Sequence, residues 1–83
     1  MSFRPLSTIA TDIRTNWPSP SPCALPYLQA MSQLTNIHEA YGLDSATSVV
    51  AYFLANAATW RGPEARRVKA ELREILRSTG YKL

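Results

Sequence analysis

The sequence predicts a small all-α domain of three to four short helices in an orthogonal or bundle-like arrangement. Apolar residues recur at helical spacing in the middle and the last quarter of the chain, and 46% of all residues are hydrophobic, which is enough for a core. Glycines stand where the periodic stretches end, at 42, 62 and 80. With 83 residues the chain is expected to form one domain, 1–83, with a short helix and a proline-rich strap in residues 1–23 and a helical core in residues 24–80.

The first helix is expected to begin at Ser7, whose hydroxyl suits the N-cap position, and to end before Trp17. Residues 18–22 then alternate proline with serine, which predicts an extended, polyproline-like strap with Trp17 fixing one end to the core. A role as a ligand for a proline-binding domain is the alternative, but these prolines lack the PxxP spacing of such ligands.

A second helix is expected from residues 24–26 to Tyr41, followed by Gly42 in a left-handed position. His38 would border its apolar face, so we expect a partly buried, structural histidine rather than a general base. The opposite face carries three amides, which are either plain helix surface or groups that bind base edges: Gln29, Gln33 and Asn36.

The third helix is expected from Ala46 to about Trp60, capped by Asp44 or Ser45. It carries no charge, and its apolar spacing marks it as the central core helix. A stripe of small residues on its flank permits another backbone to approach closely: Ala51, Ala55 and Ala58. This stripe packs against the first or second helix of the same molecule, or it forms a seam between two copies of the chain.

The fourth helix is expected to begin at Pro63, after a break at Gly62, and to stop at Gly80, with Tyr81 folding back onto Leu76. Residues 61–83 hold seven basic and three acidic side chains, a net charge of +4 in a chain of net charge +3. Two pairs of opposite charge are expected on its solvent side, Glu71 with Arg67 and Glu74 with Arg77.

Four basic residues share one flank of this helix, and we call them the basic ridge: Arg66, Lys69, Arg73 and Arg77. Neighbouring like charges repel one another, so the ridge invites a partner with negative charge. Charged ridges are also ordinary solvated surfaces, and this second interpretation stays open.

The third helix, the turn at Gly62 and the basic fourth helix together resemble a helix-turn-helix motif. The ridge would then contact phosphates and bases of DNA. Two positions depart from the motif, because Pro63 and Glu71 stand where apolar residues are usual. A rival turn at residues 41–44 would make the third helix the reading helix, but that helix has no cations.

No group of residues predicts catalysis, a cofactor, a small-molecule substrate or a metal site. His38 and Glu39 are neighbours, and neighbouring side chains on a helix point about 100° apart. Cys23 is the single cysteine and His38 the single histidine, so the chain can form neither an internal disulfide nor a zinc site of Cys/His type. The protein is therefore expected not to be an enzyme.

The lone cysteine fits a reducing cytoplasm, and residues 1–10 lack the apolar run of a signal peptide. No stretch reaches the roughly 18 consecutive apolar residues that a membrane span needs. A cytoplasmic protein without a membrane partner is expected.

About two thirds of the chain, from Pro26 to Leu76, resembles a small protein family of unknown function from actinobacteria and their phages. The segments that carry the resemblance are Pro26-Tyr27-Leu28, residues 41–45, residues 52–57, residues 59–62 and residues 65–72. It implies a short phage or prophage product that acts in the cytoplasm of a bacterial host, with no activity and no functional residues to carry over.

The sequence as a whole therefore favours a small helical module that contacts another protein or a second copy of itself. The alternative is a DNA-binding regulator of helix-turn-helix type that uses the basic ridge.

Overall fold

The computed structural model describes residues 3–42 and 44–81. Within these residues the elements are α1 (Leu6–Asn16), α2 (Leu25–Met31), β1 (Ala40–Tyr41), β2 (Asp44–Ser45), α3 (Ala46–Ala55) and α4 (Pro63–Arg77). The fold is mostly helical, as expected, but it is not purely all-α because β1 and β2 form a two-stranded antiparallel sheet. No helix of this part of the chain is both long enough and apolar enough to cross a membrane.

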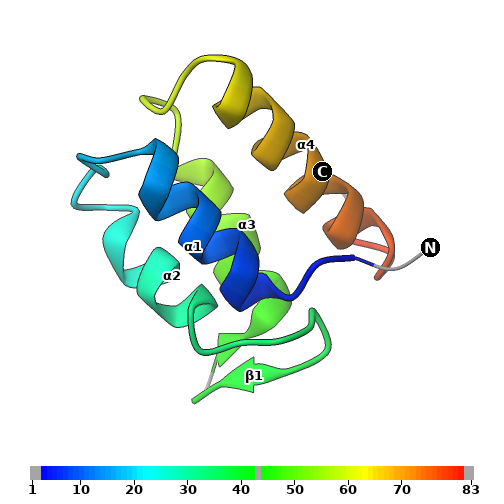
Figure 1. The fold of residues 1–83 in the computed structure, drawn as a ribbon. Helices are drawn as coiled ribbons and strands as arrows, with labels where there is room; N and C mark the ends of the chain where they lie inside the picture. Colours follow the sequence, from blue (N-terminus) through cyan, green and yellow to red (C-terminus); the bar gives the residue numbers. More distant parts are fainter. Residues whose placement is uncertain (1–2, 43, 82–83) are drawn as a thin grey trace.

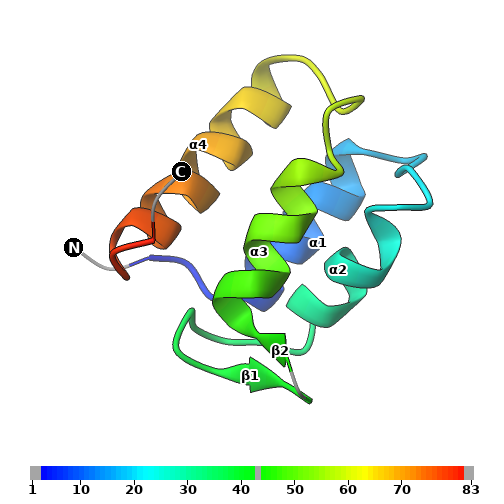
Figure 2. The same ribbon diagram turned by 180° about the vertical axis from the view of Figure 1, so that it is seen from behind.

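The four helices surround one core, with α1 and α3 each packed against both α2 and α4 (Figure 1). Seen from behind, α3 lies at the front with α4 beside it (Figure 2). Phe53 of α3 is fully buried, and every helix contributes apolar side chains to the same cluster. Among the described residues no polar or charged residue is buried, so apolar packing alone fills the interior.

α1 begins at Leu6, and its first two backbone N–H groups are bound from a distant segment. Leu6 N donates to the carbonyl of Thr35 at 2.9 Å, and Ser7 N donates to the carbonyl of Leu34 at 2.8 Å. Pro5 occupies the N-cap position without a side-chain cap. The predicted N-cap at Ser7 was wrong, because carbonyls of the loop after α2 take the place of a capping hydroxyl.

α2 ends at Met31 rather than at Tyr41, because polar side chains bind the backbone groups that a longer helix would use. The Glu39 carboxylate accepts hydrogen bonds from the N–H groups of Thr35 and Asn36. The Asn36 side chain accepts one from His38 N at 2.9 Å. His38 is exposed, so the prediction of a partly buried histidine was wrong. The three amides do not share one helix either, because Gln33 and Asn36 lie beyond its end.

A short hairpin replaces the end of the predicted second helix. Ala40 pairs with Ser45 and Tyr41 with Asp44, and Gly42 in the turn has a φ of 63°. Gly42 therefore adopts the expected left-handed conformation but ends a strand instead of a helix. Ser45 caps α3 as predicted, since its hydroxyl oxygen accepts from Ser48 N at 3.1 Å.

α3 ends at Ala55, several residues before the predicted end at Trp60. Asn56 is the C-cap, and its side-chain amide donates to the carbonyl of Tyr52 at 2.8 Å. Residues 56–62 form the connection to α4, and Gly62, with a φ of 110°, is the residue before the first turn of that helix. Gly62 thus begins α4 rather than ending α3, because only glycine readily adopts this backbone conformation.

The end of α4 and the anchor of the strap are as predicted. Tyr81 N donates to the carbonyl of Leu76 at 3.3 Å and Gly80 N to that of Arg77 at 3.0 Å, the pair of bonds of a Schellman closure. Trp17 is 7% exposed, and its ring stacks on Trp60 with centroids 5.6 Å apart and planes 9° apart. The strap itself bends at residues 18–19, so it is not the straight extended segment that was predicted.

Candidate interaction surface

The basic ridge of α4 divides into two residues with internal partners and two without. Lys69 Nζ donates to the carbonyls of Ala57 and Trp60, each at 2.7 Å, and lies 6.0 Å from the centroid of the Trp60 ring. Burial lowers the pKa of Lys69, and the positive charges of Arg73 and Arg61 lower it further. Lys69 therefore ties the α3–α4 connection to α4, because it supplies donors to carbonyls that no helix satisfies.

Arg77, at the end of the ridge, forms an ion pair with Glu74, with Nη1 2.6 Å from Oε1. This pair was predicted from the sequence. Arg66 and Arg73 are exposed and have no carboxylate partner within residues 3–42 and 44–81. Of the four ridge residues, these two hold the positive charge that is free for a partner.

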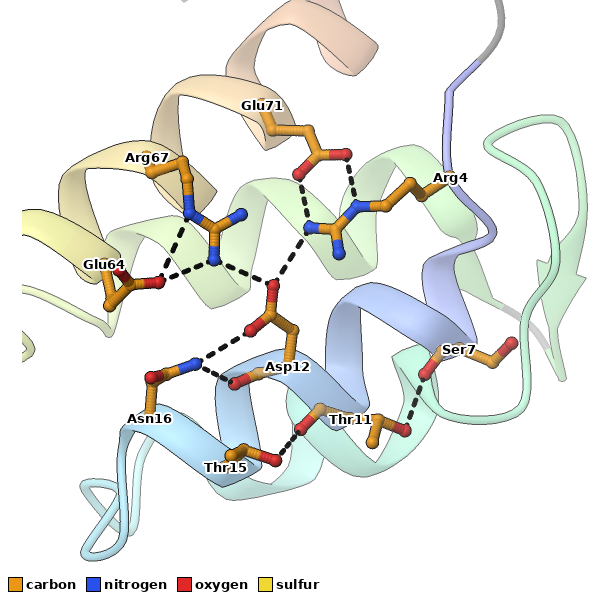
Figure 3. Close-up of polar contacts among 9 residues, drawn as sticks. All are labelled: Arg4, Ser7, Thr11, Asp12, Thr15, Asn16, Glu64, Arg67 and Glu71. Atoms are coloured by element: carbon orange, nitrogen blue, oxygen red, sulfur yellow. Dashed lines mark hydrogen bonds and ion pairs between the residues drawn. The ribbon is translucent and has the colours of Figure 1, made fainter.

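The opposite flank of α4 is joined to the N-terminal segment by a network of ion pairs (Figure 3). Arg4 binds Glu71 through two hydrogen bonds and also contacts Asp12, with Nη2 3.1 Å from Oδ2. Arg67 contacts Asp12 at 3.0 Å and Glu64 at 2.7 Å. The predicted pair of Glu71 with Arg67 was therefore wrong, because Glu71 faces Arg4.

These contacts shift the pKa values of the network in the directions that ion pairs require. The hydrogen bond from Arg67, and a second from Arg4, lower the pKa of Asp12, while partial burial opposes them. The hydrogen bond to Glu71 raises the pKa of Arg4. Sequence reasoning missed Arg4 and Asp12 as partners of α4, because nothing in their spacing reveals which segment α1 packs against.

A depression of about 330 Å³ opens beside the start of α4. Three cationic side chains line it, together with small and aromatic residues from the α3–α4 connection: Arg61, Arg66 and Lys69 with Ala58, Trp60, Gly62 and Ala65. No carboxylate is among these lining residues, and we call this site the cationic depression. Arg61 is exposed and was not counted in the ridge, because on sequence grounds it belonged to the end of the third helix.

The stripe of small residues runs from the edge of the core to the surface at the end of α3. Ala51 is half-buried, Ala55 is exposed at the last position of α3, and Ala58 is exposed in the connection that follows. The expected single stripe on one helix is thus broken at Asn56, and Ala58 lines the cationic depression instead.

Tyr52 stands between these alanines and α2. Its side chain is 56% exposed, and its ring stacks on that of Tyr27 with centroids 5.5 Å apart and planes 28° apart. We call Ala51, Tyr52 and Ala55 the outer face of α3. Sequence reasoning missed the tyrosine pair, because it depends on the angle at which α2 and α3 cross.

The α3–α4 unit departs from the helix-turn-helix that its sequence resembles. The connection covers residues 56–62, longer than the three or four residues that are usual for the turn of this motif. Glu71 occupies the inward flank toward α1 and is paired with Arg4. These features weaken the helix-turn-helix interpretation.

A second depression, of about 360 Å³, lies between the N-terminal segment, the loop after α2 and the end of α4. His38 and Arg4 are among its lining residues.

Cys23 is exposed and free. Among the described residues, no three His, Cys, Asp or Glu side chains form a cluster that could hold a metal ion.

Comparisons with protein-family models, with curated proteins and with solved structures found no match for this chain. The resemblance to a family from actinobacteria and their phages therefore stays a prediction.

Proposed function

We propose that this protein is a binding module that docks an acidic helix of another protein on the outer face of α3. The observation that carries the proposal is the character of that face. Its three residues, Ala51, Tyr52 and Ala55, are uncharged. Tyr52 and Ala55 are exposed, and Ala51 is half-buried at the edge of the core. An exposed apolar surface of this kind on a small domain is typical of a site for a partner.

The side chains on this face suit a helix rather than a flat surface. Alanines at positions 51 and 55 are one turn apart and allow a second helix to approach the backbone closely. Tyr52 offers a large aromatic anchor, and its stacking on Tyr27 restricts the ring before a partner arrives. A restricted anchor loses less side-chain entropy on binding.

Charge favours an acidic partner over a second copy of this chain. Arg61, Arg66 and Arg73 are exposed without carboxylate partners among the described residues, and the first two line the cationic depression together with Ala58, which follows the end of α3. Two copies docked through this surface would place these like charges near one another, which costs binding energy. An acidic helix would neutralise them.

The test is a selection from a displayed library of helical peptides with the protein as bait. We expect the enriched peptides to combine a net negative charge with one stripe of small or leucine side chains. Ala55→Arg should abolish their binding, because a long side chain there blocks close approach. Ala70→Arg is the matched control, since Ala70 is exposed on α4 and the added charge is the same.

Three results would overturn the proposal: enriched peptides without acidic character, equal binding to the Ala55→Arg variant, or a dimer in sedimentation that Ala55→Arg dissociates. The last result would identify a second copy as the occupant. Circular dichroism of both variants checks that the fold is retained.

The second candidate function, DNA binding through α4, is favoured by the exposed Arg66 and Arg73 and weakened by the internal contacts of Lys69 and Arg77. Fluorescence anisotropy with a random-sequence duplex at low and near-physiological salt discriminates the two. Binding that falls steeply with salt and is lost in an Arg66→Gln, Arg73→Gln variant would support DNA binding. Absence of binding at both salt concentrations would retire it.

A further inference from the structure

The cationic depression at the start of α4 can bind a ligand whether or not a helix docks on the outer face of α3. Arg61, Arg66 and Lys69 are the cationic residues that line it, together with Gly62. The ammonium of Lys69 is already bound to two carbonyls, each at 2.7 Å. The two guanidinium groups are thus left as the donors for a bound molecule.

The positive charge in this place is not compensated from within the described residues. Arg61 and Arg66 have no carboxylate partner there, and the nearest acid along the helix, Glu64, is held by Arg67 at 2.7 Å on the other flank. Burial is the main cause of the lowered pKa of Lys69, and the positive charges of Arg73 and then Arg61 lower it further, as expected where cations gather without an anion. An anion in the depression would remove this repulsion.

The backbone at the start of α4 also favours an anion. Gly62 precedes the first turn of α4 with a φ of 110°, has no side chain to cap the helix and has open space around the position of a side chain. The first-turn N–H groups are therefore not covered by a capping oxygen, and a helix start of this kind favours negative charge.

We infer that the cationic depression is a binding site for a phosphate monoester, held by the guanidinium groups of Arg61 and Arg66 beside Gly62. Planar guanidinium groups bind the oxygens of a phosphate through paired hydrogen bonds. A compact dianion fits better than the backbone of a nucleic acid, which needs cations spread along its length. Lys69 and Arg77 are engaged within the fold, so the free charge is concentrated at one end of α4.

The experiment is a titration of the ¹⁵N-labelled protein with inorganic phosphate, followed by amide chemical shifts and compared with sodium chloride at equal ionic strength. We expect saturable shifts of the Glu64 and Ala65 amides with phosphate alone. The affinity should be higher at pH 7.5 than at pH 5.5, because phosphate changes from a monoanion to a dianion between these two pH values.

A parallel titration with a short phosphoserine peptide shows whether the phosphate is free or carried on a protein chain. Saturable binding of either probe at this site supports the inference. Arg61→Gln with Arg66→Gln should weaken binding by roughly tenfold or more. Arg73→Gln is the matched control, because Arg73 is equally exposed on α4 but does not line the depression. Its affinity should change less than about twofold, since Arg73 is not a lining residue and contributes only through a charge that solvent screens.

Equal shifts with chloride would reduce the effect to screening and overturn the inference. Unchanged affinity of the Arg61→Gln, Arg66→Gln variant would do the same, provided that its circular dichroism matches that of the unaltered protein. Tighter binding of duplex DNA than of either phosphate probe, with shifts that extend to Arg73, would also overturn it in favour of a nucleic-acid surface. Both proposals invoke Arg61 and Arg66, but their tests are separate. Ala55→Arg and the peptide selection probe the outer face of α3, whereas the phosphate titration probes the cationic depression, so failure of the first leaves the second unaffected.

Discussion

The guanidinium of Arg4 is bound to the carboxylate of Glu71 through two hydrogen bonds, 3.0 Å from Nε to Oε2 and 2.6 Å from Nη2 to Oε1. Both side chains are partly shielded from solvent, with exposures of 37% and 22%. The pair joins the segment before α1 to the middle of α4, two parts of the chain that are far apart in sequence (Figure 3). A bidentate pair of this kind holds one relative orientation of the two segments.

A double-mutant cycle with Arg4→Met and Glu71→Gln should therefore give a coupling energy of about 1 kcal/mol in urea unfolding. The exposed pair Glu74 and Arg77 is the control within the same helix. Its coupling should stay below about 0.5 kcal/mol, because solvent screens an exposed pair. Equal coupling in the two cycles would show that the Arg4–Glu71 geometry adds no stability.

Asp12 should make the stability of the protein depend on pH in the acid range. Hydrogen bonds from Arg67 and Arg4 hold the pKa of Asp12 below its ordinary value of 3.8, so the folded state binds fewer protons than the unfolded state. The stability that Asp12 contributes is thus present above pH 3.8 and is lost as the pH falls through its lower, folded pKa.

Asp12→Asn should lower the free energy of unfolding by about 1 kcal/mol at pH 7. The difference from the unaltered protein should shrink between pH 4 and pH 2, which urea unfolding at a series of pH values measures. A constant difference over this range would show that the carboxylate charge of Asp12 is not the source of its effect.

The sequence predicts those elements whose signals are local. The apolar period and the terminal glycine place α4 and its Schellman closure correctly, and Ser45 marks the start of α3. The anchoring of Trp17 also follows from a large apolar side chain beside a strap that has few apolar residues. Each of these features depends on a few neighbouring residues, so no knowledge of the tertiary structure is needed.

The ends of α2 and α3 could not be predicted in the same way. An apolar period continues through Leu34 and Ile37, and both side chains are buried, but they reach the core from a loop rather than from a helix. α2 ends for two reasons. The Glu39 carboxylate accepts hydrogen bonds from backbone N–H groups of the loop, and the carbonyls of residues 34 and 35 accept hydrogen bonds from the first two N–H groups of α1. The second of these causes is a tertiary contact.

The candidate site also combines features that follow from local sequence with features that depend on tertiary contacts. The spacing of Arg66, Lys69, Arg73 and Arg77 predicts that they share one flank of the last helix, and all four lie within α4, but spacing does not reveal which charges have partners. Lys69 reaches carbonyls of a connection that sequence reasoning had assigned to the end of a helix, and the path of that connection depends on tertiary packing.

Glu39 should stabilise the loop after α2 through its two backbone hydrogen bonds. Glu39→Ala leaves the N–H groups of Thr35 and Asn36 to water and should cost about 1 kcal/mol in unfolding free energy. Amide hydrogen exchange should accelerate at Thr35, Asn36 and the first turn of α1, since Leu6 N bonds to Thr35 O. Glu74→Ala, which removes an exposed acid without backbone contacts, is the control. Unchanged exchange at Leu6 would show that the stability of the loop does not affect the start of α1.

Trp17 should be among the residues that matter most for stability. Its ring stacks on Trp60 and meets Phe53 edge-on, with centroids 6.3 Å apart, so it closes the core where the strap begins. Trp17→Ala should destabilise the fold by roughly 3–5 kcal/mol, the cost of a large buried aromatic side chain. Near-ultraviolet circular dichroism should lose the signal of the stacked indoles. A loss below about 1 kcal/mol would contradict the packing described for this residue.

Substitution of Lys69 distinguishes a structural role of this ridge residue from a role in binding. Its ammonium group is the donor to the carbonyls of Ala57 and Trp60 in the α3–α4 connection. Lys69→Met keeps much of the side-chain volume but removes the donor to the Trp60 carbonyl and leaves the Ala57 carbonyl with only the Trp60 N–H, so it should cost about 1–2 kcal/mol in unfolding free energy. Arg73→Met is the matched control and should change stability by less than about 0.5 kcal/mol, because Arg73 is exposed. Tryptophan fluorescence during urea unfolding measures both. If the two variants lose equal stability, Lys69 belongs functionally with the exposed cations of α4, and the hydrogen bonds to the connection do not hold it in place.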